Sequence, residues 1–137
     1  MEDLLSSTFF YIFAQTNFLT MELSNIKRGD ILVEQCDKTK VDNMMARSTM
    51  VFIAENQPTF SNFGADLGDS WYDIPTLAAI LLDDSFMINT EIGINVSSDS
   101  IRKPTIKEFM DIMNRLKKNG FRYNKKTKNI ENYESNK

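Results

Sequence analysis

The chain of 137 residues contains no histidine and only one cysteine, Cys36. Without histidine, the chain cannot build a Ser-His-Asp or Cys-His nucleophile or a zinc site that uses imidazole. A single cysteine cannot close an internal disulfide, so the sequence shows no adaptation to an oxidising compartment. The acidic neighbours Glu34 and Asp37 would raise the pKa of the Cys36 thiol rather than activate it. These absences exclude the commonest nucleophilic enzymes.

Glycine is also scarce, and none of the five glycines follows the spacing of a Walker or dinucleotide-binding loop. Asp66, Asp69 and Asp73 could hold a hard cation, but the EF-hand order with its closing glutamate is absent, so a solvated acidic loop is favoured. Asp83 and Asp84 are adjacent, and adjacent side chains on an extended chain point in opposite directions, so a turn is favoured over a carboxylate pair. We predict no catalytic residue, metal site, cofactor or small-molecule substrate.

The sequence lacks a long hydrophobic run, whereas a membrane-spanning helix needs about 20 apolar residues. The apolar cluster at 9–14 is too short, and the first residues, Met1-Glu2-Asp3, are acidic where a secretion signal is positive. We therefore expect no membrane association, and a location in the host-cell cytoplasm or in a virion assembled there. Met21 offers an alternative translation start, and the sequence leaves open which start is used.

What the chain does contain is typical of one folded domain, with 42% hydrophobic and 26% charged residues. Ten phenylalanines and eight methionines predict a soft, aromatic-rich core, with an adaptable binding surface as the less favoured alternative. We expect a single domain over residues 21–131, preceded by an apolar extension or helix at 1–20 and followed by a frayed tail at 132–137.

Charge is divided along the chain. Residues 1–100 hold 5 basic and 15 acidic side chains, a net charge of −10, and residues 101–137 hold 11 basic and 4 acidic ones, a net charge of +7. The favoured interpretation is solvated lysines, or a basic segment that packs near the acidic part. The alternative is a nucleic-acid face, which the acidic pI of the whole chain disfavours. That face would consist of Lys117, Lys118, Arg122, Lys125, Lys126 and Lys128.

Two apolar segments are candidates for binding a partner. Apolar residues recur near helical spacing in residues 2–17, and the segment is apolar on nearly all sides. It must therefore be buried against the domain or against another protein. Residues 56–73 contain glycine and proline among polar residues and predict a long loop that carries several aromatics. Those aromatics either plug the core edge, which is favoured, or contact a partner. The candidate partner-binding residues are Phe9, Phe10, Phe13, Phe60, Phe63, Trp71 and Tyr72.

The middle of the chain predicts a small antiparallel sheet. Residues 27–30 form a turn, followed by strands at 31–35 and 49–54 that pair as a hairpin. Pro75 to Leu82 suits a short helix, with a buried strand as the alternative. Further strands are predicted at 86–88 and 92–96.

The strongest local prediction is a C-terminal helix. Thr105 and Glu108 form a capping box, and Gly120 is well placed as the left-handed residue after the helix. Phe121 and Tyr123 then return as a strand, and Ile130 closes a short hairpin. The predicted apolar stripe of the helix consists of Ile106, Phe109, Met110, Met113 and Leu116.

The C-terminal segment resembles the end of small proteins that are abundant in gut Bacteroidales and their phages, including crAss-like phages. The match covers about 26–55 and 100–131, with Tyr123 where the family usually has tryptophan. The resemblance implies a small β-barrel closed by a capped helix and a hairpin, and it identifies no active residue. It is carried by Gly29-Asp30-Ile31-Leu32-Val33, Ile101-Arg102-Lys103-Pro104-Thr105, Glu108, Leu116, Gly120, Phe121, Tyr123, Asn124, Lys128 and Ile130.

Together these patterns predict an α+β domain: a small antiparallel sheet, of which an SH3-like barrel is one form, with an N-terminal and a C-terminal helix. The predicted function is a non-enzymatic protein-interaction module of phage or mobile-element origin, acting as a virion component or as an inhibitor of a host protein. Self-association is one form of this interaction. The alternative is a nucleic-acid-binding regulator that uses the C-terminal basic face.

Overall fold

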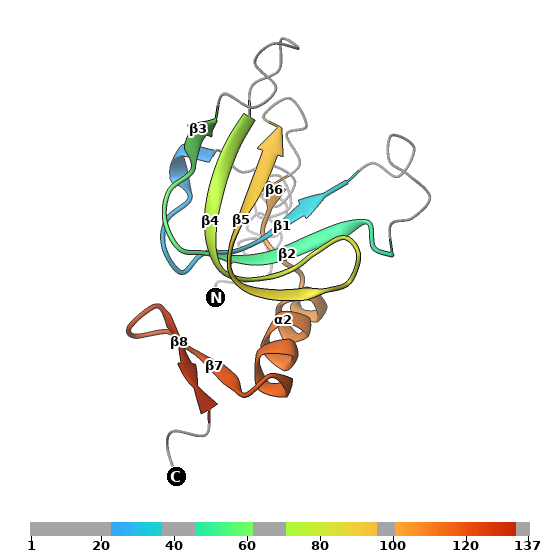
Figure 1. The fold of residues 1–137 in the computed structure, drawn as a ribbon, viewed down its shortest axis with the longest axis vertical. Coiled ribbons are helices and arrows are strands. Elements are labelled where there is room, and N and C mark those ends of the chain that lie inside the picture. The colour runs from blue at the N-terminus through green and yellow to red at the C-terminus, as the bar shows by residue number, and fades with distance from the viewer. Residues whose placement is uncertain (1–22, 37–45, 62–70, 96–100, 134–137) are drawn as a thin grey trace, which may run out of the picture.

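The fold is built around the hairpin that the sequence predicts between 31–35 and 49–54. The computed structural model describes residues 23–36, 46–61, 71–95 and 101–133, and the predicted N-terminal helix lies outside these ranges. A curled antiparallel sheet carries a helix and a small hairpin on one side, which is an α+β arrangement (Figure 1). The elements are η1 (Leu23–Asn25), β1 (Ile31–Gln35), β2 (Thr49–Ala54), β3 (Thr59–Ser61), β4 (Trp71–Ile80), β5 (Phe86–Asn95), β6 (Ile101–Arg102), α2 (Ile106–Lys118), β7 (Phe121–Asn124) and β8 (Asn129–Asn132).

The sheet is an antiparallel meander with an added edge. β1 pairs with β2 as predicted, and β6 pairs with the other side of β1. β2 and β3 pair with successive parts of β4, so β3 extends the line of β2, and β5 pairs with β4 along its length. β7 and β8 form a separate two-stranded sheet.

An irregularity in the middle of β4 and β5 curls the sheet into a half-barrel. The register between β2 and β4 shifts between Ile53 and Ala54, which leaves Leu77 as an extra residue on β4. On the neighbouring strand, Asn89 has a φ of 58°, a left-handed conformation that asparagine tolerates well. Such bulges bend a strand and increase its twist. The two ten-residue strands therefore bend together.

Two expectations for this region change in the structure. Residues 56–73 are not one long loop, because β3 occupies 59–61 and β4 begins at Trp71. Residues 75–82 are not a helix, because β4 continues to Ile80, as the alternative interpretation had it. Pro75 lies in β4 between the residues that pair with β2 and the residues that pair with β3. Its missing N–H therefore interrupts neither pairing, and the strand tolerates the proline.

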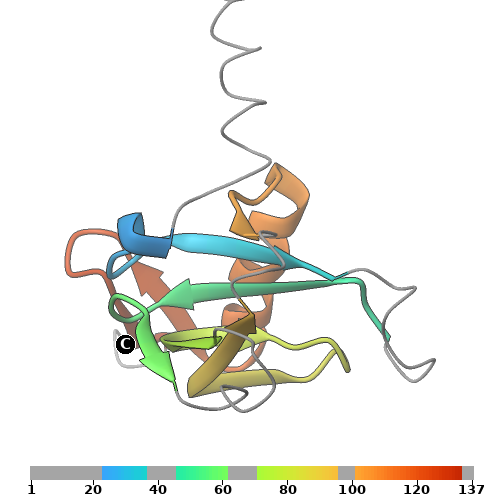
Figure 2. The ribbon, with the colours of Figure 1, turned by 90° about the horizontal axis from the view of Figure 1, so that it is seen from above.

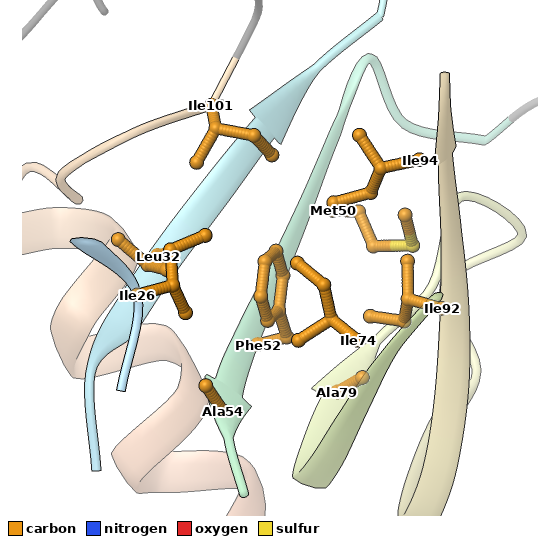
Figure 3. Packing of buried hydrophobic residues seen from close by; sticks show 10 residues of the cluster. All are labelled: Ile26, Leu32, Met50, Phe52, Ala54, Ile74, Ala79, Ile92, Ile94 and Ile101. Atoms are coloured by element: carbon orange, nitrogen blue, oxygen red, sulfur yellow. The ribbon is translucent and has the colours of Figure 1, made fainter. Parts of the chain in front are cut away.

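The inner face of the half-barrel holds the first core (Figure 3). Alternate residues of β2 and β4 point inward, and Ile26 from the turn before β1 packs beside them. Ile74 and Ala79 are five residues apart and would face opposite sides of a regular strand. The extra residue at the bulge places both on the inner face. The buried members are Ile26, Leu32, Met50, Phe52, Ala54, Ile74, Ala79, Ile92, Ile94 and Ile101.

The outer face of the same sheet is covered by α2 and the β7–β8 hairpin (Figures 1 and 2). Val51 and Ile53 of β2 meet Ile112 and Leu116 of α2 in a second buried cluster. Because both faces are covered, β2 reads as a continuous apolar run rather than an alternating one. Phe121, Tyr123 and Ile130 of the hairpin pack against this second core while remaining partly exposed.

Helix α2 has the predicted capping box, with mutual hydrogen bonds between Thr105 and Glu108. Its predicted apolar stripe is partly wrong, because Ile106 is 82% exposed and Met110 is also exposed. The buried helix residues are Ile112 and Leu116, since the sheet lies against the middle and end of the helix rather than its start. Within the described ranges, no helix is both long enough and apolar enough to cross a membrane.

Candidate functional site

Two aromatic side chains, Phe60 and Tyr72, extend the inner face of the half-barrel to its rim. Phe60 on β3 pairs with Tyr72 on β4, and Tyr72 pairs with Ile94 on β5, so the three side chains share one face. Ile94 is buried, Tyr72 is half-buried and Phe60 is 58% exposed. The rings of Phe60 and Tyr72 meet edge to face with centroids 5.6 Å apart. Tyr72 therefore packs at the core edge, whereas Phe60 offers most of its surface to solvent.

The other predicted partner-binding residues are distributed differently. Trp71 is half-buried at the start of β4, where it pairs with Ser61 of β3 and Asn95 of β5. Four of the candidates lie outside the described residues: Phe9, Phe10, Phe13 and Phe63.

The predicted basic face is divided among separate places. Lys117 and Lys118 line a separate depression on α2 together with Arg115. The Arg122 guanidinium pairs with the Glu131 carboxylate across the hairpin at 3.2 Å. Lys126 lies exposed in the hairpin turn. Only two of the six predicted residues, Lys125 and Lys128, line the larger groove described next.

A basic groove of about 630 Å³ lies between the turn before β1, the segment leading into α2 and the β7–β8 hairpin. Four lysines line it, and three different parts of the chain supply them. The rest of the lining is largely apolar or aromatic, with Asp30 as its acidic side chain. The lining residues are Asn25, Lys27, Gly29, Asp30, Ile31, Leu32, Lys103, Pro104, Phe109, Tyr123, Lys125 and Lys128.

Close contacts hold the walls of this basic groove together. The Tyr123 hydroxyl donates to the Gly29 carbonyl at 3.2 Å. Arg28 donates from Nε to the Lys128 carbonyl at 3.0 Å and from Nη1 to the Glu55 carbonyl at 3.3 Å. Gly29 has a φ of 89°, and a β-carbon there would lie 2.7 Å from the Tyr123 hydroxyl. Glycine is therefore required where the turn meets the hairpin.

The aspartates considered as chemical groups have structural partners. Asp83 and Asp84 lie in the turn between β4 and β5. Hydrogen bonds from Ser85 lower the pKa of Asp83, and hydrogen bonds from Arg115 and Arg47 lower that of Asp84. The Asp84 carboxylate lies 2.6 Å from Arg115 Nη2 and 3.1 Å from Arg47 Nη1. These contacts tie the turn to α2.

Metal ligands are not gathered anywhere in the described residues, which contain no group of three or more acidic or cysteine side chains suited to a metal ion. Asp73 lies half-buried on β4. Its predicted companions Asp66 and Asp69 fall outside the described ranges.

One buried carboxyl has no such partner. Glu34 is 8% exposed on β1, and it pairs with Met50 and Ile101, which both belong to the inner core. Within the described chain, no donor or cation is bonded to its side chain. Burial raises the pKa of Glu34 from 4.5 to about 7. Burial and then the Glu34 charge also raise the pKa of the Cys36 thiol, in the direction the sequence predicted.

Sequence reasoning missed Lys27, Lys103 and Phe109 as members of the basic groove. The turn and the helix cap are visible as local patterns, but nothing in a single sequence shows that they meet. Comparisons of the chain with protein-family models, with curated proteins and with solved structures each found no match.

Proposed function

We propose that the chain is a non-enzymatic interaction module that binds a protein partner through the rim of its half-barrel. The observation that carries this proposal is the exposure of Phe60, a large aromatic side chain held in place over Tyr72. Aromatic side chains supply much of the binding energy at protein interfaces because they bury a large area at a small entropic cost.

The position of Phe60 on β3 supports this role. Among the described strands, β3 pairs only with β4, so it forms an edge of the sheet. Sheet edges present backbone groups that an extended segment of another protein can pair with. Phe60 would then act as the side-chain anchor beside such a pairing. An SH3-like barrel, proposed here as the finer description of the half-barrel, would present its rim in this way.

The setting of the module is also a proposal. The resemblance of the C-terminal segment to proteins of gut Bacteroidales and their phages suggests a phage or mobile-element origin. Within that setting the partner is either a neighbouring virion subunit, a second copy of this chain included, or a host protein in the cytoplasm that the module inhibits. Asp83 and Asp84 support a non-enzymatic role, because both serve the turn that joins β4 to β5.

The test places a photocrosslinking amino acid at Phe60 and, as a matched control, at Met87, an exposed apolar residue on β5. We expect a discrete crosslinked protein from the producing host at position 60 and none at position 87. Phe60→Ala should weaken the affinity of the identified protein by about 2 kcal/mol, roughly thirtyfold. A crosslinked homodimer would identify a second copy as the partner.

Two results would contradict the proposal. One is the same set of crosslinked products at both positions, and the other is unchanged affinity of the identified partner for Phe60→Ala. Thermal unfolding of each variant provides the folding control. We expect Phe60→Ala to remain folded because its side chain is mostly exposed.

A further inference from the structure

Arginine and lysine are used differently in this molecule. The five arginines each donate to a carbonyl, amide or carboxylate oxygen of the chain itself: Arg28, Arg47, Arg102, Arg115 and Arg122. In contrast, none of the four lysines of the basic groove has a carboxylate within 4.0 Å among the described residues. The arginines therefore stabilise the fold, and these lysines keep their charges available.

Four lysines line the basic groove although their residues are distant in sequence. Lys27 comes from the turn before β1, Lys103 from the segment before α2, and Lys125 and Lys128 from the hairpin turn. Among the described residues of the lining, the only acid is Asp30, whose carboxylate accepts a hydrogen bond from the Lys27 backbone N–H at 3.0 Å. Four cations with one acid among them repel one another, and an anionic ligand would relieve the repulsion.

We propose that the basic groove binds a short acidic segment of a partner protein, with its carboxylates against the lysines and an apolar side chain against Phe109 and Pro104. This site shares no residue with the Phe60 rim and does not depend on it.

The size and chemistry of the basic groove favour a peptide over a nucleic acid. A volume of about 630 Å³ accommodates a few residues, whereas sites that grip duplex DNA typically contact roughly 6–10 phosphates. The net charge of the whole chain is −3, which disfavours non-specific binding to a long polyanion. The apolar lining from Ile31, Pro104 and Phe109 also suits an acidic segment that carries a hydrophobic side chain.

The groove is arranged before any ligand arrives. The bonds from Tyr123 to Gly29 and from Arg28 to Lys128 fix the hairpin turn relative to the turn before β1. The capping box orders the first turn of α2, which directly follows the lining residues Lys103 and Pro104. Binding therefore needs little rearrangement of the chain, which favours affinity for a short ligand.

The test measures fluorescence anisotropy of a short labelled peptide in which glutamate alternates with leucine and phenylalanine, using the full chain. The variant Lys103→Glu/Lys125→Glu reverses two exposed charges of the groove. We expect it to weaken peptide binding about tenfold or more, and we expect affinity to fall with added salt. The matched control Lys107→Glu/Lys126→Glu makes the same charge change beside the groove, at residues that do not line it. It should bind within about twofold of the unchanged chain.

Three outcomes would overturn the proposal. The first is equal binding of a peptide in which glutamine replaces glutamate, because the carboxylates would then not matter. The second is an equal loss in both double variants, which would indicate a general field rather than a groove. The third is tighter binding of a labelled oligothymidine than of the peptide, which would make nucleic acid the occupant. Thermal unfolding confirms that each variant is folded, and Phe60→Ala should bind the peptide normally.

Discussion

The two faces of the curled sheet differ in how completely their polar groups are bonded. The outer face meets α2 and the hairpin, and polar contacts around this layer are paired, from the Arg102–Glu108 ion pair to the contacts of Arg47 and Arg115 with Asp84. On the inner face, the buried Glu34 carboxyl has no bonded partner within the described part of the chain, and the pair of Tyr72 and Phe60 leaves Phe60 exposed.

This difference indicates a division of roles within one small domain. Where the outer face meets α2, apolar side chains are buried and the arginines are paired with carboxylates, which is what stability requires. The inner face keeps groups that stability alone would not select, since a buried carboxyl without a hydrogen bond is destabilising when charged. The candidate binding groups therefore lie at the rim of the inner face and in the basic groove, apart from the contacts that join the outer face to α2.

The largest expected effect comes from opening the outer face. Leu116 is fully buried between α2 and the sheet, so Leu116→Ala should lower the free energy of unfolding by about 2–5 kcal/mol. The matched control is Ile106→Ala on the same helix, which should change it by less than about 0.5 kcal/mol because Ile106 is mostly exposed. Urea unfolding followed by the fluorescence of Trp71 measures both. Similar losses in the two variants would mean that α2 does not cover the sheet as described.

The second effect belongs to the inner face and depends on pH. Glu34 has a pKa of about 7 in the folded chain and 4.5 as its ordinary value, so between these pH values the folded state holds a proton that the unfolded state has released. Rising pH should therefore lower the free energy of unfolding by about 3 kcal/mol across this window, with no further loss above it. Glu34→Gln cannot titrate and should lack this fall, so it should be more stable than the unchanged chain at pH 8.

The comparison between the two proteins isolates Glu34 from the other acids. Asp83, Asp84 and Glu108 have lowered pKa values, so their contributions are lost at lower pH and are common to both proteins. The measured quantity is the difference in free energy of unfolding between Glu34→Gln and the unchanged chain from pH 4.5 to 8. A difference that stays constant across this range would show that Glu34 titrates normally.

Local patterns in the sequence were sufficient for the hairpin of β1 and β2, the turn at 27–30 and the capped helix. Each depends on residues close together in the chain, such as Thr105 with Glu108. The segment 75–82 was ambiguous because a short apolar run suits a buried helix or a buried strand equally. The long pairing with β5 decided for the strand, and a single sequence cannot show that pairing.

The candidate sites were less predictable than the fold. Phe60 was identified among the aromatics, but its exposure depends on its place at the sheet edge, which required β3. The basic segment was visible from composition, yet its arginine is paired with Glu131, and its lysines are divided among the basic groove, the depression on α2 and the hairpin turn. Lys27 and Lys103 joined the groove only through tertiary contacts. Composition therefore showed where charged residues lie along the chain, and the fold determines which of them come together.

The smallest expected effect tests whether the capping box at the start of α2 stabilises the layer that covers the outer face. Thr105→Ala removes the oxygen that accepts from the Glu108 backbone N–H at 3.1 Å, and it should lower the free energy of unfolding by about 1 kcal/mol. Thr105→Ser keeps that oxygen and should be nearly neutral.

Burial alone would raise the pKa of Glu108, but hydrogen bonds from Arg102 and the Thr105 backbone lower it overall. The loss in Glu108→Gln should therefore shrink in acid as Glu108 becomes protonated, whereas the loss in Thr105→Ala should persist as long as the helix forms. Equal pH dependence of the two losses in urea unfolding would mean that the cap and the ion pair act as one unit.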